Sequence, residues 1–187
     1  MAVRIAFVNG KGGVGKTTCS LLFAAALLDA KKSVSVEDGD PQSTITSVAI
    51  RLKIPQGSIG EDVVVMDTAP NLENPATIEA IRVADLVVLV TTPDPPDLPT
   101  TLATSRVIKS IRTGKTVLLF NRVKLNTYEC NEIPRVAAEI PFPLLPHHLT
   151  DLRAYPRAHL HGWKALAASS RAAAIEVARD ILLVLNS

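Results

Sequence analysis

The sequence contains little cysteine: Cys19 and Cys130 are its two cysteines, and they lie far apart in the chain. Two such cysteines cannot build the disulfide framework of a small secreted domain, so we expect a reducing compartment. We expect Cys19 to pack as a small apolar side chain. Aromatic residues make up 4% of the chain, which argues against recognition of nucleic acid by base stacking.

Long apolar runs are also absent. No stretch approaches the roughly 18 uninterrupted apolar residues of a membrane-spanning helix, so none is expected. The first residues do not form a basic and then apolar leader with a cleavage site, so we expect the protein to stay in the cytoplasm. Neither sign of charge dominates, because 20 basic residues face 18 acidic ones. A formal net charge of +2 neither demands nor excludes a nucleic acid partner.

Histidines are few and gather late in the chain. Their spacing matches no metal-binding motif, and neither a cysteine nor a pair of carboxylates accompanies them, so we expect surface positions rather than a metal site. The four residues are His147, His148, His159 and His161.

A glycine-rich segment at 10–18 is the most informative part of the sequence. It lies between an apolar run at 3–8, which predicts a buried strand, and an apolar run that predicts a helix. This is the strand, loop and helix setting of a phosphate-binding loop, whose glycines bring backbone N–H groups close to phosphate oxygens. The helix start adds the positive end of its dipole. The expected nucleotide-binding residues are Gly10, Lys11, Gly12, Gly13, Val14, Gly15, Lys16, Thr17 and Thr18.

Three side chains of this loop have distinct expected roles. Lys16 would bridge the β- and γ-phosphates, and Thr17 would hold Mg²⁺ through its hydroxyl group. Lys11 is a second lysine that an ordinary phosphate-binding loop does not need. Two ammonium groups so close together repel each other unless concentrated negative charge neutralises both, and a nucleotide triphosphate supplies that charge.

Two further segments place carboxylates at the expected ends of strands. Asp38 and Asp40 follow a second expected strand at 33–37, and Asp67 follows a strand rich in β-branched residues at 62–66. The carboxyl ends of parallel strands face the crevice where α/β sheets bind ligands. A strand that ends in aspartate is the Walker B pattern, whose carboxylate holds magnesium directly or through water. A solvated acidic turn is the alternative for the segment around Asp38.

Apolar strands alternate with helical stretches along the chain. This alternation predicts an α/β fold, in which a single domain across 1–187 contains a mostly parallel twisted sheet with helices on both faces. Prolines at 93, 95, 96 and 99 predict a stiff crossing loop, and those between 134 and 156 are expected to break any long helix. The tail from Lys164 to Leu185 is expected to be mostly helical. The expected strands are 3–8, 33–37, 62–66, 85–91 and 115–121, and the expected helices are 17–31, 43–52, 74–83 and 98–112.

Together, the loop at 10–18 and the Asp-Gly-Asp-Pro-Gln segment at 38–42 resemble the ParA/MinD family, which are P-loop NTPases with a deviant Walker A motif. The closest likeness is to short partition ATPases without a helix-turn-helix. The resemblance implies an ATPase that uses ATP and Mg²⁺ and forms a homodimer when ATP binds. Lys11 would reach the phosphates of the other subunit. The implied catalytic residues are Lys11, Lys16 and Asp40, of which Asp40 positions water, and the implied magnesium residues are Thr17, Asp38 and Asp67.

Looser matches extend the resemblance. Asn121 and Arg122 resemble a strand end that contacts the base, and Pro146 resembles a loop that closes over adenine. The segment 43–60 is shorter than in family members, so we expect a peripheral strand or helix to be missing.

The family also suggests partners. An ATP-bound dimer would bind DNA without sequence preference, associate with the nucleoid, and be released when a centromere-binding or other activating protein accelerates hydrolysis. Basic residues recur near the C-terminal end, and contact with phosphates is the expected mode. A solvated face is the alternative for the same residues. The candidate DNA-binding residues are Arg153, Arg157, Lys164 and Arg171.

Three other functions remain as alternatives. A MinD-like ATPase that cycles on membranes would need an amphipathic terminal helix, but Asp180 and Asn186 flank the apolar run at 181–185 where basic residues are expected, so packing on the core is favoured. A carrier like the nitrogenase iron protein would need bridging cysteines, which Cys19 and Cys130 do not match. A scaffold that binds nucleotide without turnover is disfavoured because Lys16, Thr17, Asp40 and Asp67 are all present.

Overall fold

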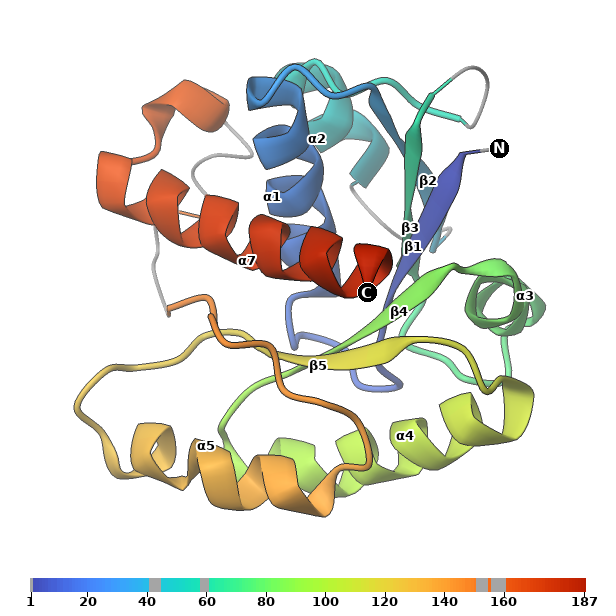
Figure 1. Ribbon diagram of the computed structural model, residues 1–187, viewed down its shortest axis with the longest axis vertical. Helices are drawn as coiled ribbons and strands as arrows, with labels where there is room; N and C mark the ends of the chain where they lie inside the picture. The colour runs from blue at the N-terminus through green and yellow to red at the C-terminus, as the bar shows by residue number, and fades with distance from the viewer. Residues whose placement is uncertain (1, 41–44, 58–60, 151–154, 156–160) are drawn as a thin grey trace.

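Five parallel strands form the sheet within the part of the chain that this computed structural model describes, residues 2–40, 45–57, 61–150, 155 and 161–187 (Figure 1). Their spatial order is β2-β3-β1-β4-β5. All four neighbouring pairs are parallel. The expected α/β fold with a parallel sheet is therefore confirmed. The strands are β1 (Val3–Val8), β2 (Val34–Gly39), β3 (Val63–Thr68), β4 (Leu86–Thr91) and β5 (Thr116–Phe120).

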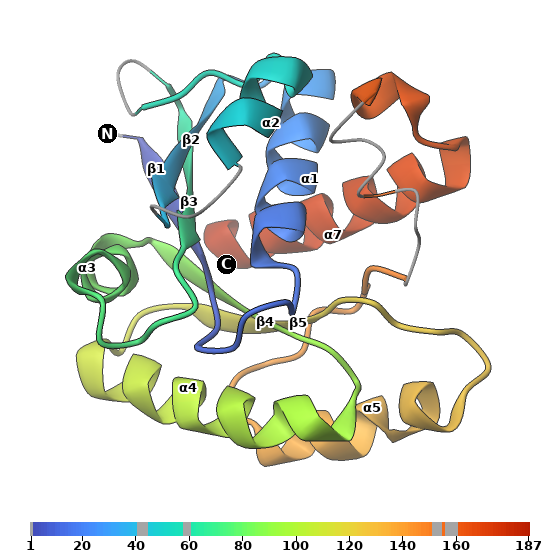
Figure 2. The same ribbon diagram turned by 180° about the vertical axis from the view of Figure 1, so that it is seen from behind.

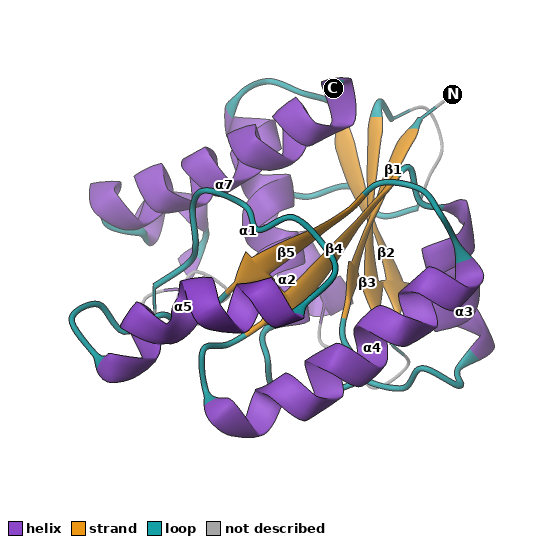
Figure 3. Ribbon diagram, turned by 60° about the horizontal axis from the view of Figure 1, so that its bottom comes forward, coloured by secondary structure: helices purple, strands orange, loops and turns teal. Residues whose placement is uncertain are grey.

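Helices cover both faces of the sheet, as expected for strands joined by right-handed crossovers. On one face, α7 lies across α1, with α2 beside it, and the other face carries α3, α4 and α5 (Figure 1, Figure 2). Figure 3 shows the sheet between these two layers. The helices are α1 (Lys16–Asp29), α2 (Ile45–Leu52), α3 (Pro75–Val83), α4 (Leu98–Ile111), α5 (Tyr128–Glu139) and α7 (Ala168–Asn186), with short 3₁₀ turns η1 (Pro95–Asp97) and η2 (Trp163–Ala165).

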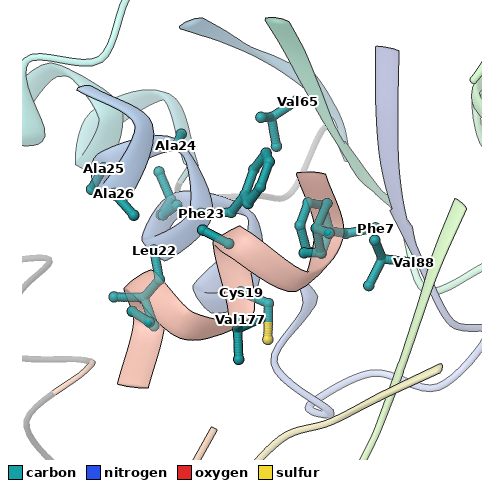
Figure 4. Close-up of a cluster of buried hydrophobic side chains, with 14 of the residues drawn as sticks. Phe7, Cys19, Leu22, Phe23, Ala24, Ala25, Ala26, Val65, Val88 and Val177 are labelled. Atoms are coloured by element: carbon teal, nitrogen blue, oxygen red, sulfur yellow. The ribbon is translucent and has the colours of Figure 1, made fainter. Parts of the chain in front are cut away.

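Each face of the sheet has its own apolar core because successive side chains of a strand point to opposite faces. In β1, Ile5 and Phe7 pack beneath α1 and α7, whereas Ala6 and Val8 pack beneath the opposite helices. The rings of Phe7 and Phe23 lie 5.8 Å apart in the first of these cores (Figure 4). Strands buried on both faces explain why the sequence shows continuous apolar runs rather than alternation.

The apolar core also contains two residues whose packing was expected from the sequence. Cys19 is buried among apolar side chains of the α1 layer, and this burial raises the pKa of its thiol (Figure 4). Ile181 of α7 is fully buried in the same core, although Leu183 is 61% exposed. Among the described residues, no helix combines the length and apolar character needed to cross a bilayer.

The expectation that prolines break every long helix in the region 122–163 is wrong for α5. This helix includes Pro134, which has no N–H group to donate to the carbonyl of Cys130 one turn earlier. Because Ile133 is the single buried residue of α5, water can reach the carbonyl that proline leaves unbonded. The side chain of Thr127 caps the helix by accepting a hydrogen bond from the Cys130 N–H at 3.3 Å.

Two irregular segments extend the edges of the sheet. Along β5, Leu145 N–H donates to Leu118 O at 2.9 Å and Leu149 N–H donates to Phe120 O at 3.0 Å. This pairing brings the segment around Pro146 to the carboxyl end of β5. At the other edge, Val36 N–H donates to Pro55 O at 2.9 Å, so the chain after α2 covers part of β2.

Candidate functional site

The glycine-rich loop connects β1 to α1 at the carboxyl edge of the sheet. Gly13 and Gly15 have φ angles of 82° and 95°, a left-handed region that favours glycine. A Cβ atom at Gly15 would lie 2.1 Å from Asn121 Nδ2, so the close approach also requires glycine. Helix α1 begins at Lys16 with neither a side-chain cap nor an acidic residue in its first turn. Its first N–H groups are therefore suited to an anion.

Lys16 is the buried cation of this loop. It is 6% exposed, and its Nζ donates a hydrogen bond to the carbonyl oxygen of Lys11 at 3.2 Å. Burial lowers the pKa of Lys16, while Asp67 and Asp40 favour the charged form. An ammonium group that has lost most of its hydration gains strongly from a phosphate at the same place.

Asp67 lies near the end of β3, and its carboxylate contacts the first turn of α1. Its Oδ2 accepts a hydrogen bond from Thr17 Oγ1 at 2.6 Å. Its Oδ1 is buried and has no hydrogen-bond partner among the described residues. Burial raises the pKa of Asp67 to about 6, against the opposing effects of the Thr17 hydrogen bond and the Lys16 charge. A buried carboxylate with one unpaired oxygen beside a hydroxyl group is suited to a bound cation.

The strands that carry the acidic residues extend further than the sequence indicated. Pairing of β2 with β3 continues through Asp38 with Asp67 and Gly39 with Thr68, so both aspartates lie inside strands rather than after them. Asp38 is exposed, and its carboxylate accepts hydrogen bonds from Asp40 N at 3.0 Å and from Thr46 Oγ1 at 3.2 Å.

These residues fit a magnesium ion that is also bound by phosphate. Within the described ranges, no group of three histidine, cysteine, aspartate or glutamate side chains could hold a metal ion by itself. Magnesium in nucleotide sites is held by one or two carboxylates, with phosphate oxygens and water as its other ligands. Thr17 and the unpaired oxygen of Asp67 match that requirement, with Asp38 adjacent.

Asp40 follows β2 and is half-buried. Its charge acts on the pKa values of both Lys16 and Asp67, which places it within electrostatic reach of the site. Its expected role in orienting water stays a prediction.

Lys11 is turned away from Lys16. Its Nζ donates a hydrogen bond to Asp97 Oδ1 and lies 3.5 Å from the carbonyl oxygen of Pro96. Its backbone N–H donates to Asn9 Oδ1 at 2.8 Å. The two lysines of the loop therefore point in different directions, and Asp97 is a partner that the sequence did not reveal.

Asn121 supports the loop. It is buried, and its Nδ2 donates to the carbonyl oxygen of Val14 at 2.9 Å. Arg122 follows with a φ angle of 56° and an exposed side chain, and Pro146 is exposed on the neighbouring segment. Asn121 and Arg122 directly follow β5, and the segment around Pro146 pairs with β5. The contact of these three residues with adenine stays a prediction.

A buried polar network holds the loop from below. Asn9 Nδ2 donates to Val90 O at 2.7 Å and to Thr101 Oγ1 at 3.2 Å, and Gly10 N–H donates to Thr104 Oγ1 at 3.1 Å. Sequence reasoning missed these residues. The polar Asn9 directly after a buried strand, and the threonines repeated through the start of α4, were the signals that could have identified them.

The candidate DNA-binding residues are only partly described. Arg153 and Arg157 lie outside the described residues. Lys164 is exposed in η2. Arg171 Nη1 donates to the carbonyl oxygens of Lys164 and Leu166, so this nitrogen already has a structural function.

Comparison with known proteins agrees with this geometry. Residues 5–162 match the family described as the CobQ/CobB/MinD/ParA nucleotide binding domain. The chain is 32% identical over 180 residues to the Maintenance of carboxysome distribution protein A of Gloeobacter kilaueensis, an alignment that covers 87% of this chain and 83% of that protein.

Solved structures share the fold at lower identity. A putative plasmid partition protein from Borrelia burgdorferi bound to AMPPNP has a TM-score of 0.78 and 16% identity, covering 98% of this chain and 99% of that one. MinD from Pyrococcus horikoshii complexed with Mg-ADP has a TM-score of 0.77 and 18% identity, covering 97% and 96%. The family match spans most of the chain, and the phosphate-binding loop, Lys16, Thr17 and Asp67 lie together inside it. This protein therefore belongs to the CobQ/CobB/MinD/ParA family of nucleotide-binding domains, as a P-loop ATPase.

Proposed function

We propose that this protein is an ATP-driven dimerising ATPase that distributes a cargo within the cytoplasm. One observation carries the proposal: a single loop holds two ammonium groups that point in different directions. Lys16 is directed into its own loop, whereas Lys11 is directed outward to the start of α4. One cation can then serve the nucleotide of its own subunit and the other a nucleotide bound by a facing copy.

Within one subunit, the loop N–H groups and Lys16 bind the phosphates of ATP. Mg²⁺ would be held by Thr17 and Asp67 with Asp38 nearby, and it would neutralise charge that develops during phosphoryl transfer. Asp40 would orient the attacking water. Catalysis in this arrangement is positioning together with charge stabilisation.

Between subunits, ATP would act as the bridge. Two copies that bring their Lys11 side chains to one interface repel each other unless both γ-phosphates are present. Hydrolysis removes those phosphates and with them the attraction. The protein would therefore be dimeric with ATP and monomeric after hydrolysis. An activating partner protein that speeds hydrolysis would set the lifetime of the dimer.

The proposal also specifies a cargo and a matrix, which is the cellular material that the ATP-bound dimer binds. The name of the Gloeobacter kilaueensis relative, which refers to carboxysome distribution, supports a cargo-distributing role. Nucleoid DNA is the proposed matrix, contacted through phosphates by exposed basic residues such as Lys164. A plasmid is the alternative cargo, handled through a centromere-binding partner. The membrane-cycling alternative is less favoured, because Ile181 is buried in the core rather than presented on a surface.

The test is the size of the protein in solution with ADP, with ATP, and with ATP and random duplex DNA at low and high salt. We expect monomers with ADP, dimers with ATP, and DNA binding that needs ATP and weakens steeply as salt rises. Lys16→Ala is the matched control that should give none of these changes. Dimers that form equally with ADP, or a dimer that binds anionic liposomes and not DNA, would contradict the proposal.

A further inference from the structure

Asp97 receives one donor on each carboxylate oxygen. Lys11 Nζ donates to Oδ1, and Thr92 Oγ1 donates to Oδ2 at 2.6 Å. The residue is 7% exposed, although it lies at a surface loop between β4 and α4. Both oxygens are therefore satisfied only while Lys11 stays in its present position.

The local chain fixes this carboxylate in place. Asp97 N–H donates to Asp94 O at 2.9 Å, and Asp94 N–H donates to Thr92 Oγ1 at 3.2 Å. Thr101 Oγ1 donates to the Asp97 carbonyl at 2.9 Å. The prolines of η1 restrict the backbone further. A carboxylate held this rigidly loses little conformational freedom when it binds a lysine.

The two partners differ in their access to water. The Lys11 side chain is 35% exposed and the Asp97 side chain is 10% exposed. Lys11 can regain hydration if it leaves, but Asp97 would keep a mostly buried charge with Thr92 as its one donor among the described residues. Removing one partner of a buried ion pair is costly because the remaining charge is uncompensated.

We propose that Asp97 is a positioning residue that restrains Lys11 in the nucleotide-free subunit and so raises the ATP requirement for dimerisation. The inference rests on the proposed function, in which Lys11 reaches a nucleotide of the facing copy. Asp97 and that γ-phosphate then compete for one ammonium group. A dimer forms when the phosphate outcompetes the carboxylate, which a γ-phosphate does and the diphosphate of ADP does not.

This restraint acts on dimerisation and not on the binding of ATP by a single subunit. The side chains of Lys16 and Thr17 donate their hydrogen bonds to the Lys11 carbonyl and to Asp67, whereas the Asp97 carboxylate accepts from Lys11 and Thr92. ATP can therefore bind one subunit while Lys11 is still held. Neutralising Asp97 should change dimerisation without changing nucleotide affinity of the monomer.

The test compares Asp97→Asn with Asp94→Asn, a substitution of an exposed acid in the same loop. Both are made in an Asp40→Ala background that stops hydrolysis, and dimer formation is followed by sedimentation during ATP titration. We expect D97N to lower the protein concentration at half-dimerisation by about tenfold. This effect lies between the effects expected from losing an exposed ion pair and from losing a buried one. D94N should leave it unchanged, and ADP affinity should be the same in all variants.

Two further comparisons make the result decisive. In a Lys11→Ala background, where ATP-driven dimerisation should be lost, Asp97→Asn should not restore it, because the restrained group is absent. If D97N does not fold, Asp97→Ser takes its place. Weaker dimerisation of a folded variant would mean that Asp97 orders Lys11 for the dimer, and no change would mean that the pair is incidental; either overturns the inference. Failure of the unsubstituted Asp97 protein to dimerise with ATP would instead overturn the proposed function.

Discussion

Thr17 Oγ1 donates a hydrogen bond to Asp67 Oδ2 across 2.6 Å, which joins the first turn of α1 to the end of β3. The other oxygen of Asp67 is buried without a partner among the described residues. One carboxylate therefore links the phosphate-binding loop to the sheet and keeps an oxygen for a cation. This buried and incompletely paired carboxylate lowers the stability of the nucleotide-free protein when Asp67 is ionised.

Asp67→Asn should stabilise the nucleotide-free protein at neutral pH. Burial raises the pKa of Asp67 from 3.8 to about 6, so between these two pH values the folded state holds a proton that the unfolded state has lost. The free energy of unfolding therefore falls by roughly 3 kcal/mol as pH rises from about 4 to above about 6. Thermal unfolding at pH 4 and pH 7.5 checks this, because the advantage of the variant should appear only at the higher pH. A variant that is less stable at both pH values would contradict it.

The same substitution should abolish the extra stability that Mg²⁺ adds to the ATP-bound protein. Magnesium needs the ionised carboxylate, so in the unsubstituted protein its effect should weaken as pH falls and Asp67 becomes protonated. The measurement is the melting temperature with ATP, with and without magnesium. An equal magnesium effect in both proteins would show that Asp67 is not a ligand.

Gly15→Ala should destabilise the protein more than Gly13→Ala. Both positions have positive φ angles, which cost an alanine about 1–2 kcal/mol. At Gly15 the new Cβ atom would also meet Asn121 Nδ2, whereas at Gly13 it would meet nothing within 4 Å. Adding Asn121→Ala should recover part of the loss at Gly15 and none at Gly13, as a double-mutant cycle in urea unfolding would show. Equal costs at the two glycines would contradict the contact.

Lys16→Ala and Asp40→Ala should separate binding from hydrolysis. Lys16 is buried in the loop, so its loss should remove nucleotide binding altogether. Asp40 is expected to act on the attacking water, so its loss should preserve ATP-driven dimers and stop phosphate release. Sedimentation and phosphate release measured on the same samples distinguish the two. Loss of both properties in Asp40→Ala would assign Asp40 a different function.

Lys164→Ala should weaken DNA binding without changing stability. Its side chain is exposed, and removing an ammonium group that pairs with a DNA phosphate should reduce the dependence of affinity on salt. Arg171→Ala is the informative comparison, because it removes hydrogen bonds to the carbonyl oxygens of Lys164 and Leu166 and should lower the melting temperature. Unchanged salt dependence in Lys164→Ala would remove this residue from the proposed DNA surface.

Much of the fold could be predicted because it depends on local pattern. Continuous apolar runs mark strands that are buried on both faces, and glycine spacing marks the loop before α1. The loop residues, Asp38 and Asp67 do lie at one edge of the sheet, since parallel strands bring their carboxyl ends together. The ends of β2 and β3 were placed too early, because pairing between these strands carries Asp38 and Asp67 into the ladder.

The contacts that position the site could not be predicted from local pattern. Asp97 lies 86 residues from Lys11 in sequence, and Asn121 lies 107 residues from Val14. Nothing in a stiff, proline-rich loop indicates that one of its carboxylates turns inward to a distant lysine. Such pairings depend on how crossovers bring strands together, and they become visible only in the folded chain.

Trp163 is the one tryptophan of the chain, and it is buried in the apolar core that also contains residues of α1 and α7. Its fluorescence, excited at the red edge of its absorption band where tyrosine contributes little, therefore comes from one known position. That position lies in η2, beside Lys164, so a single unlabelled sample can report in real time whether ATP or DNA alters the surroundings of this end of the molecule.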